Sequence, residues 1–193
     1  AARWRARLAA AAANPAAPRI GLCWWGSPHS RRSSIPLPAL EPVLALPGFA
    51  FHALQKEIDP SHRDWLARHA RLAEHSAALV DFDATAALIE ALDLVVTIDT
   101  SIAHLAGALG RPTWLMLRAS PDWRWLRDRT DSPWYPTMRL FRQGPDRTWE
   151  PVVAAVAAAL VAAFRPPPGG EDGRAGDQAA VTPPSTTRPA PFM

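Results

Sequence analysis

The sequence has 193 residues, which suffices for one full-sized domain and is short for two well-packed ones. Hydrophobic residues make up 48% of it, but no uninterrupted apolar run approaches the roughly 18 to 20 residues that span a bilayer, so we expect no transmembrane segment. A single cysteine, Cys23, excludes an intramolecular disulfide and a cysteine-rich zinc site, and a reducing, cytoplasmic setting fits this composition best.

The net charge of +3 comes from the first part of the chain and not from its centre. Residues 1–19 carry four arginines and no acidic side chain, whereas residues 20–164 carry 14 basic and 15 acidic side chains. Binding to a phosphate backbone requires a clustered basic face, and a nearly neutral centre does not offer one. We therefore expect no nucleic-acid partner.

The two ends of the chain differ from its centre. The alanine- and arginine-rich start, Ala1 to Ala13, lacks the features of a signal peptide and is predicted to be the end of a helix, with residues 1–18 connecting to a missing upstream part. Residues 165–193 are rich in proline and glycine and are predicted to be disordered, because such a segment buries too little apolar surface to offset the entropy of ordering it.

Between these ends, short apolar runs alternate with helical patterns. The expected strands are residues 19–24, 49–55, 78–81, 94–98, 113–117 and 138–141. The expected helices are residues 37–46, a polar helix capped at Asp59 that runs to about residue 71, residues 84–92 capped by Asp83, residues 101–109 ended by Gly110, and residues 149–164. Strands that read as continuous apolar runs and alternate with helices indicate a doubly wound, Rossmann-like α/β domain over residues 19–164. Its ligand is expected at the carboxyl ends of the strands.

The turn between the strand at 94–98 and the helix at 101–109 is the most informative segment. It contains Asp99, Thr100 and Ser101, at a helix start whose free N–H groups and positive dipole end favour an anion such as phosphate. Because its charge would repel a phosphate, Asp99 is expected to cap the helix or to accept a hydrogen bond from Ser101. The simpler alternative is that Asp99 and Thr100 only cap the helix and that His104 bonds to a carbonyl on its face.

The run Asp99-Thr100-Ser101, followed by His104-Leu-Ala-Gly-Ala-Leu-Gly110-Arg-Pro112, resembles the donor-binding signature of the family 9 glycosyltransferases, the ADP-heptose:lipopolysaccharide heptosyltransferase group. The chain is similar in particular to the version attached to bacterial tetratricopeptide-repeat proteins, from about Arg19 to Phe164. Supporting segments are Gly21-Leu-Cys-Trp24-Trp25-Gly26-Ser27-Pro28, Ser34-Ile-Pro-Leu37, Leu54-Gln55-Lys56, residues 83–96, and Pro121-Asp-Trp123-Arg-Trp125 with Ser132-Pro-Trp134-Tyr135-Pro136.

This resemblance implies the C-terminal half of a GT-B glycosyltransferase, which transfers a sugar with inversion from a nucleotide-diphosphate donor. It implies neither a metal nor another cofactor, since helix N–H groups and basic side chains neutralise the diphosphate. Thr100 and Ser101 would donate to the diphosphate, and His104 would lie beside the phosphates or the donor sugar. Ser101 replaces the glycine that is common at this place in heptosyltransferases, and its N–H is still available.

The loop that begins at Trp25 and Gly26 resembles the family's stretch with a basic residue aimed at the donor phosphates. That position falls on Ser33, and Arg32 next to it is the candidate to replace the missing charge, because a guanidinium can contact a phosphate with two hydrogen bonds. Lys56 follows the second strand at the same sheet edge and is a second candidate phosphate ligand. For both side chains the alternative is an ordinary solvated surface position.

The remaining candidates are weaker. Trp123, Trp125, Trp134 and Tyr135 either pack a long loop onto the domain or stack on a sugar or base, and Cys23 is expected to be a core residue. No pair of carboxylates suggests a catalytic base, which in the family belongs to the N-terminal domain.

Two hypotheses therefore remain open. The first is the donor-binding half of an inverting glycosyltransferase that acts on an unknown glycan, lipid or protein acceptor and lacks activity without its N-terminal domain. The second is a non-catalytic nucleotide-sugar-binding or protein-interaction module attached to tetratricopeptide repeats. The sequence upstream of Ala1 distinguishes them, because a Rossmann-like domain there supports the enzyme and repeats there support the module.

Overall fold

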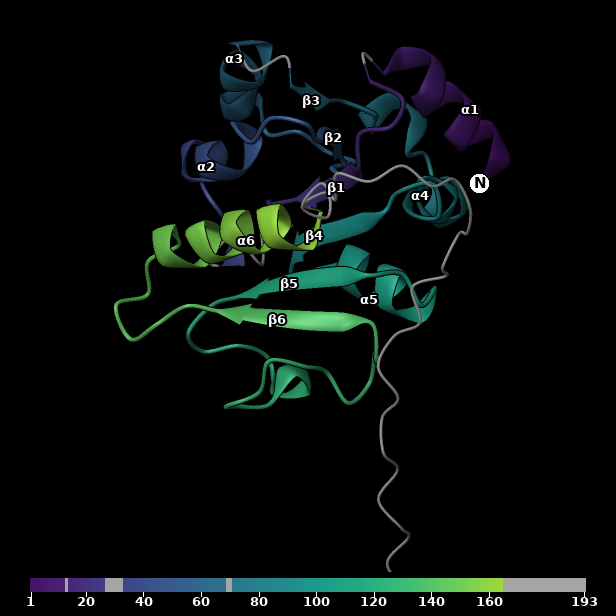
Figure 1. Ribbon diagram of the computed structural model, residues 1–193. Helices are drawn as coiled ribbons and strands as arrows, with labels where there is room; N and C mark the ends of the chain where they lie inside the picture. Colours follow the sequence, from purple (N-terminus) through teal and green to yellow (C-terminus); the bar gives the residue numbers. More distant parts are fainter. Residues whose placement is uncertain (13, 27–32, 69–70, 165–193) are drawn as a thin grey trace, which may run out of the picture.

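The computed structural model describes residues 1–12, 14–26, 33–68 and 71–164. Its centre is a six-stranded parallel sheet with the strand order β3-β2-β1-β4-β5-β6 (Figure 1). The strands are β1 (Arg19–Cys23), β2 (Ala50–Ala53), β3 (Leu72–Ala73), β4 (Leu94–Ile98), β5 (Thr113–Leu117) and β6 (Met138–Arg142). All residues of β4 and β5 are buried, as expected for strands that read as continuous apolar runs. The structure confirms the doubly wound α/β fold.

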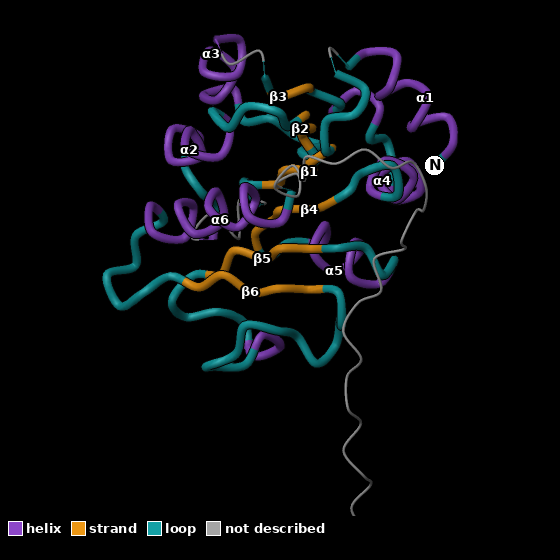
Figure 2. The backbone as a smooth tube through the Cα atoms, viewed as in Figure 1, coloured by secondary structure: helices purple, strands orange, loops and turns teal. Residues whose placement is uncertain are grey.

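Helices cover both faces of the sheet, as Figure 2 shows. The α-helices are α1 (Ala2–Ala11), α2 (Glu41–Leu44), α3 (Pro60–Arg68), α4 (Phe82–Ile89), α5 (Ser101–Ala108) and α6 (Glu150–Ala163), and the 3-10 helices are η2 (Leu37–Leu40), η3 (Ser76–Ala78) and η4 (Trp123–Trp125). Side chains of α2 and α6 form one hydrophobic cluster with the strands, and side chains of α1, α4 and α5 form another on the opposite face. None of the helices in the described part is long and apolar enough to cross a membrane.

Side chains of β4 alternate between the two faces of the sheet and pack into both hydrophobic clusters. Val96 and Ile98 belong to the cluster under α2 and α6, and Val95 belongs to the cluster under α1, α4 and α5. Since successive strand residues point to opposite faces, a run without polar alternation is what a sheet covered on both sides requires. Gly110, with a φ of 64°, follows the end of α5 in the left-handed conformation that suits glycine, as expected from the sequence.

One predicted strand and one predicted helix cap are wrong. The third strand is Leu72–Ala73 and not residues 78–81, because Leu72 is buried against β2 and pairs with Phe51, whereas Val80 is 67% exposed. The cap of α4 is Asp81 and not Asp83: the Asp81 carboxylate accepts from the N–H of Ala84 at 2.7 Å. Asp81 has the extended conformation of an N-cap, which places its side chain over the first free N–H groups.

The first helix, α1, packs on the domain, which the sequence pattern did not predict. Leu8 of α1 is 2% exposed within the α4–α5 cluster, and the Arg5 guanidinium donates to the carbonyl oxygen of Glu90 at 3.1 Å. Trp4 meets the ring of His75 edge-on, with 5.2 Å between ring centroids. The predicted disorder of residues 165–193 concerns a segment outside the described residues.

A pair of buried histidines joins β2 to the segment after β3. His52 Nδ1 and His75 Nε2 lie 3.1 Å apart, and the side chains are 7% and 9% exposed. One ring must donate and the other accept, so the accepting ring is neutral. Burial, together with the nearby His75, lowers the pKa of His52 from 6.5 to about 4. Burial also lowers the pKa of His75.

This pair predicts a loss of stability in mild acid. Between pH 6.5 and 4 the folded protein binds fewer protons at His52 than the unfolded chain does, so the contribution is complete above pH 6.5 and is lost as the pH falls to about 4. The shift from 6.5 to about 4 corresponds to on the order of 3 kcal/mol. Urea unfolding of the double variant His52→Gln, His75→Gln should show a shallower pH dependence over this range than the parent. Equal slopes in parent and double variant would contradict the prediction.

Candidate functional site

The carboxyl ends of β1, β2 and β4 surround a cavity of about 470 Å³. In the strand order, β1 is flanked by β2 on one side and β4 on the other. The helices after β1 and β4 lie on opposite faces, so the chain leaves these two strands in opposite directions and opens a crevice between their ends. The cavity is lined by Cys23, Trp25, Gly26, Leu54, Gln55, Lys56, Glu57, Ile58, Asp59, Pro60, Thr100, Ser101 and Ile102. Five candidates from the sequence thus meet there, namely Trp25, Gly26, Lys56, Thr100 and Ser101.

The start of α5 faces this cavity without a side-chain cap from the described residues. Thr100 occupies the N-cap position in extended conformation, but its hydroxyl turns towards the Thr97 hydroxyl at 3.5 Å and the Cys23 thiol at 3.7 Å. Leading N–H groups of the helix therefore remain open to a ligand, together with the positive end of its dipole. The predicted capping role of Asp99 is wrong, because the N-cap lies one residue later and the half-buried Asp99 carboxylate does not cap the helix.

Lys56 brings a positive charge to the cavity. Its ammonium donates to the carbonyl oxygen of Val80 at 3.0 Å, a contact that positions the side chain without neutralising it. Glu57 and Asp59 follow at the same rim. The Asp59 carboxylate also accepts from Ser61, from the backbone N–H at 2.9 Å and from the hydroxyl at 2.6 Å, which holds the start of α3.

The segment after β1 forms the opposite side of the cavity. The N–H of Gly26 donates to the Ser34 hydroxyl at 3.0 Å, and the Trp25 indole meets the ring of His62 edge-on, with centroids 4.5 Å apart. Arg32 lies outside the described residues, so its predicted phosphate contact stays a prediction, whereas Ser33 is half-buried. Burial raises the pKa of the Cys23 thiol, which keeps it protonated and able to donate.

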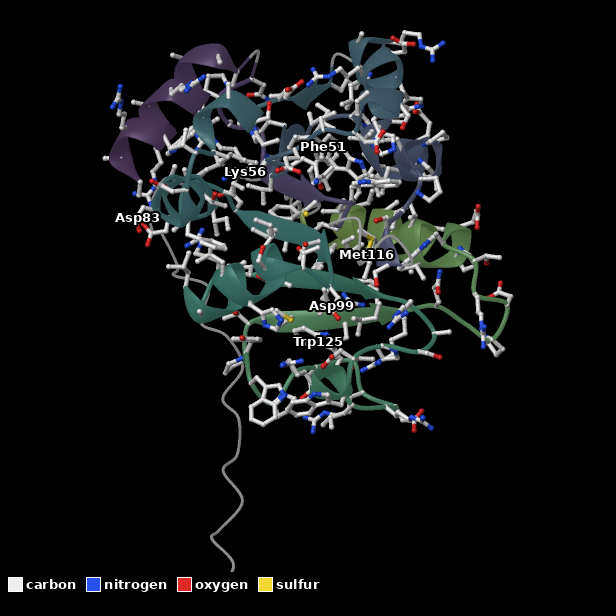
Figure 3. The ribbon with its side chains drawn as sticks, turned by 180° about the vertical axis from the view of Figure 1, so that it is seen from behind. Phe51, Lys56, Asp83, Asp99, Met116 and Trp125 are labelled. Carbon is white, nitrogen blue, oxygen red and sulfur yellow. The ribbon has the colours of Figure 1, made fainter. Side chains whose placement is uncertain are left out.

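His104 lies one turn into α5 and does not line this cavity. Its Nδ1 is 3.0 Å from the Tyr135 hydroxyl, and its ring stacks on Trp125 with 5.3 Å between centroids. Figure 3 shows Asp99 between Lys56 and Trp125, so the aromatic loop lies on the side of Asp99 away from Lys56. The structure thus separates His104 from the side chains that meet at the cavity.

The aromatic loop contains both packing and exposed side chains. Trp125 is fully buried, and Tyr135 packs so closely on α5 that a Cβ at Gly107 would lie 2.5 Å from its ring. Trp123 and Trp134 are 67% and 57% exposed. For Trp125 and Tyr135 the packing alternative is therefore the observed one. At the cavity, by contrast, sequence reasoning missed Gln55, Glu57 and Asp59 as lining residues, although Gln55 stood in a segment that resembles the family.

The comparisons with known proteins place part of the chain near one glycosyltransferase family. Residues 60–125 match glycosyltransferase family 9 (heptosyltransferase). This segment runs from α3 to η4 and includes the β4–α5 turn. Protein FlbA of Caulobacter vibrioides is 33% identical over 164 residues, which cover 81% of this chain and 26% of FlbA, so the chain spans about a quarter of that relative.

Two solved structures share the fold. E. coli heptosyltransferase WaaC with ADP-2-deoxy-2-fluoro heptose has a TM-score of 0.56 at 14% identity, covering 76% of this chain and 44% of WaaC. E. coli ADP-heptose lps heptosyltransferase II has a TM-score of 0.56 at 19% identity, covering 84% of this chain and 53% of that structure. The predicted resemblance to family 9 is supported, whereas the upstream repeats and the C-terminal position stay predictions.

The close approach of Tyr135 to α5 predicts a specific packing defect. Gly107→Ala places a methyl group 2.5 Å from the Tyr135 ring and forces the aromatic loop to shift, so we expect a loss of about 1 to 3 kcal/mol of stability. Gly144→Ala is the matched control, because its added Cβ meets only the rotatable Asp146 carboxylate at 3.1 Å. Urea unfolding measures the stability of both variants and of the parent. Equal unfolding midpoints for Gly107→Ala and the parent would show that the loop is not packed as described.

Proposed function

We propose that the chain is the donor-binding half of a metal-independent, inverting glycosyltransferase, and that its cavity binds the diphosphate of a nucleotide-sugar. The observation that carries this proposal is the uncapped start of α5 in a cavity that also contains Lys56. N–H groups and a helix dipole attract an anion at this position, and the Lys56 ammonium adds a full positive charge. The match of residues 60–125 to family 9 supports the same assignment.

The lining residues suit both parts of such a donor. The N–H groups near Ser101 and the ammonium of Lys56 would hold the diphosphate and stabilise the charge that develops on it as the sugar leaves. The carboxylates of Glu57 and Asp59 can accept hydrogen bonds from ribose or sugar hydroxyls. The acceptor would enter from a second domain, which also contributes the catalytic base in the proposed complete enzyme.

A non-catalytic nucleotide-sugar-binding module is the alternative. One observation favours it. Asp59 is one of the two carboxylates that line the cavity, and it already accepts two hydrogen bonds from Ser61, which makes it a poor catalytic base. The enzyme and the module share donor binding and differ in turnover. Release of nucleoside diphosphate from the sugar donor, dependent on an acceptor and on the upstream domain, supports the enzyme.

The donor site predicts a selective effect of Ser101→Pro. Ser101 is the first residue of α5 and follows the extended Thr100, so proline fits there and removes only one N–H group. We expect affinity for a nucleoside diphosphate to fall about tenfold or more, as for the loss of one charge-assisted hydrogen bond, with stability little changed. Calorimetry with ADP, GDP, CDP and UDP in the presence of a chelator measures this effect.

Phe82→Pro is the matched control for the change at Ser101. Phe82 is the first residue of α4, is 62% exposed, and follows an extended N-cap, but it does not line the cavity. It should bind the diphosphates as the parent does. Parent-like binding by Ser101→Pro would place the anion away from α5, and no binding by the parent would refute the donor site.

Lys56 predicts a charge-dependent contribution. Lys56→Ala should weaken nucleoside diphosphate binding about tenfold and reduce its dependence on salt, because one phosphate contact is lost. Lys56→Arg keeps the charge and should recover most of the affinity, although the guanidinium differs in shape. Equal affinities of parent and Lys56→Ala at low salt would show that Lys56 does not contact the phosphates and is an ordinary solvated surface residue.

A further inference from the structure

Gln55 is a buried amide at the point where the hydrogen-bonded ladder between β1 and β2 ends. The last backbone contact of that ladder runs from the N–H of Leu54 to the carbonyl oxygen of Leu22 at 2.8 Å. Directly beyond it, the Gln55 side chain is 7% exposed and lines the cavity. Its amide therefore lies where two strands separate and their exit loops begin.

The Gln55 carbonyl oxygen binds the segment that leaves β1. It accepts from the N–H of Trp24 at 3.2 Å, from the N–H of Trp25 at 3.1 Å and from the thiol of Cys23 at 3.3 Å. Three donors on one oxygen fix the direction in which the chain turns after the strand. They also leave these buried backbone groups satisfied where no neighbouring strand can pair with them.

The amide nitrogen of Gln55 binds both exit loops. It donates to the carbonyl oxygen of Trp25 at 3.0 Å and to that of Glu57 at 3.4 Å. The loop that presents Gly26 is thus tied to the loop that presents Lys56, across the floor of the cavity. Only a neutral amide offers an acceptor and two donors in this shape, because a carboxylate has no proton to donate and a hydrocarbon forms no hydrogen bond.

The same contacts extend to the third side of the cavity. The Cys23 thiol, which donates to Gln55, is also 3.7 Å from the hydroxyl of Thr100, the N-cap of α5. Gln55 therefore connects the segments after β1 and β2 directly, and it reaches the helix start through Cys23. These are the three parts that the proposed donor site needs at a constant spacing.

We infer that Gln55 is a positioning residue of the donor site: without touching the reacting atoms, it sets the spacing of the Gly26 and Lys56 loops against the start of α5. This inference rests on the proposed function. It adds that nucleotide-sugar affinity depends on the donors of the Gln55 amide and not only on the groups that contact the diphosphate.

The test compares two variants of the full chain by calorimetry with ADP, GDP, CDP and UDP in turn. Gln55→Met keeps the size and neutrality of the side chain but removes all five hydrogen bonds, so affinity should fall about tenfold at every pH. Gln55→Glu should bind about tenfold more weakly than the parent near pH 8. Towards about pH 5.5 it should approach the parent, since a buried carboxyl takes up a proton readily and can then donate to the Trp25 carbonyl.

The parent, measured over the same pH range, corrects for titration of the ligand and of the groups around the amide, which are Cys23, Lys56, Glu57, Asp59 and His62. Gln143→Met is the matched control. Gln143 also joins two loops, accepting from the N–H of Ala119 at 3.1 Å and donating to the carbonyl oxygen of Arg147 at 3.0 Å, but it lies outside the cavity. It should lose stability while binding the diphosphates as the parent does.

The outcomes separate the two proposals. If the parent binds and Gln55→Met binds equally well, whatever its stability, Gln55 is a structural residue only and the inference is overturned. If Gln55→Met does not fold, Gln55→Glu decides, because a loss of affinity that does not recover in acid contradicts a role for the donors. If the parent binds none of the four diphosphates, the proposed function fails and the inference fails with it.

Discussion

The pairing of β1 with β4 at the centre of the sheet is the constraint on which the rest of the structure depends. Four successive residues of β1, from Ile20 to Cys23, pair with β4, and β2 occupies the other side of β1. Gly21 permits this density, because a Cβ there would lie 2.6 Å from Leu92 and 2.7 Å from Leu54. Because α2 follows β1 on one face of the sheet and α5 follows β4 on the other, the chain leaves the carboxyl ends of these two strands in opposite directions, which creates the cavity.

The polar side chains at the carboxyl ends of these strands form hydrogen bonds with one another, and none of them caps the start of α5. Thr97, Thr100, Cys23 and Gln55 lie in one chain of contacts, and each uses its polar atoms on protein partners. The N-cap hydroxyl is thereby drawn away from the first N–H groups of α5. Donors that are already oriented need no rearrangement when an anionic ligand binds, which is what electrostatic stabilisation of a diphosphate would require.

At the β6 edge of the sheet, the aromatic loop packs against the strand, and its polar groups bond to protein partners and not to a cavity. β6 is an edge strand, and the loop covers it: the N–H of Leu140 donates to the carbonyl oxygen of Thr130 at 2.7 Å, and Arg142 donates to the carbonyl oxygens of Arg129, at 2.9 Å, and of Trp125. Covering an edge prevents pairing with another chain. His104 belongs to this packed region, which explains why a residue of the helix that starts at the cavity bonds to Tyr135 and does not reach the cavity.

Local pattern determined much of this protein. Continuous apolar runs predicted five of the six strands close to their observed bounds, and the turn at 99–101 with Gly110 beyond it predicted α5. These features depend on residues adjacent in the chain, where hydrophobic period and turn chemistry act directly. The resemblance to family 9 arose from the same local runs, and the match over residues 60–125 supports it.

Only the tertiary structure decided the remaining features, because they depend on residues far apart in the chain. Leu72–Ala73 is a strand since Leu72 meets Phe51, although the two residues alone have no strand period. Gln55 bonds to residues about 30 positions earlier, and His52 to His75 across 23. Spacing along a sequence cannot show which polar side chain completes the hydrogen bonds of a distant loop, because that choice follows from which strand ends meet.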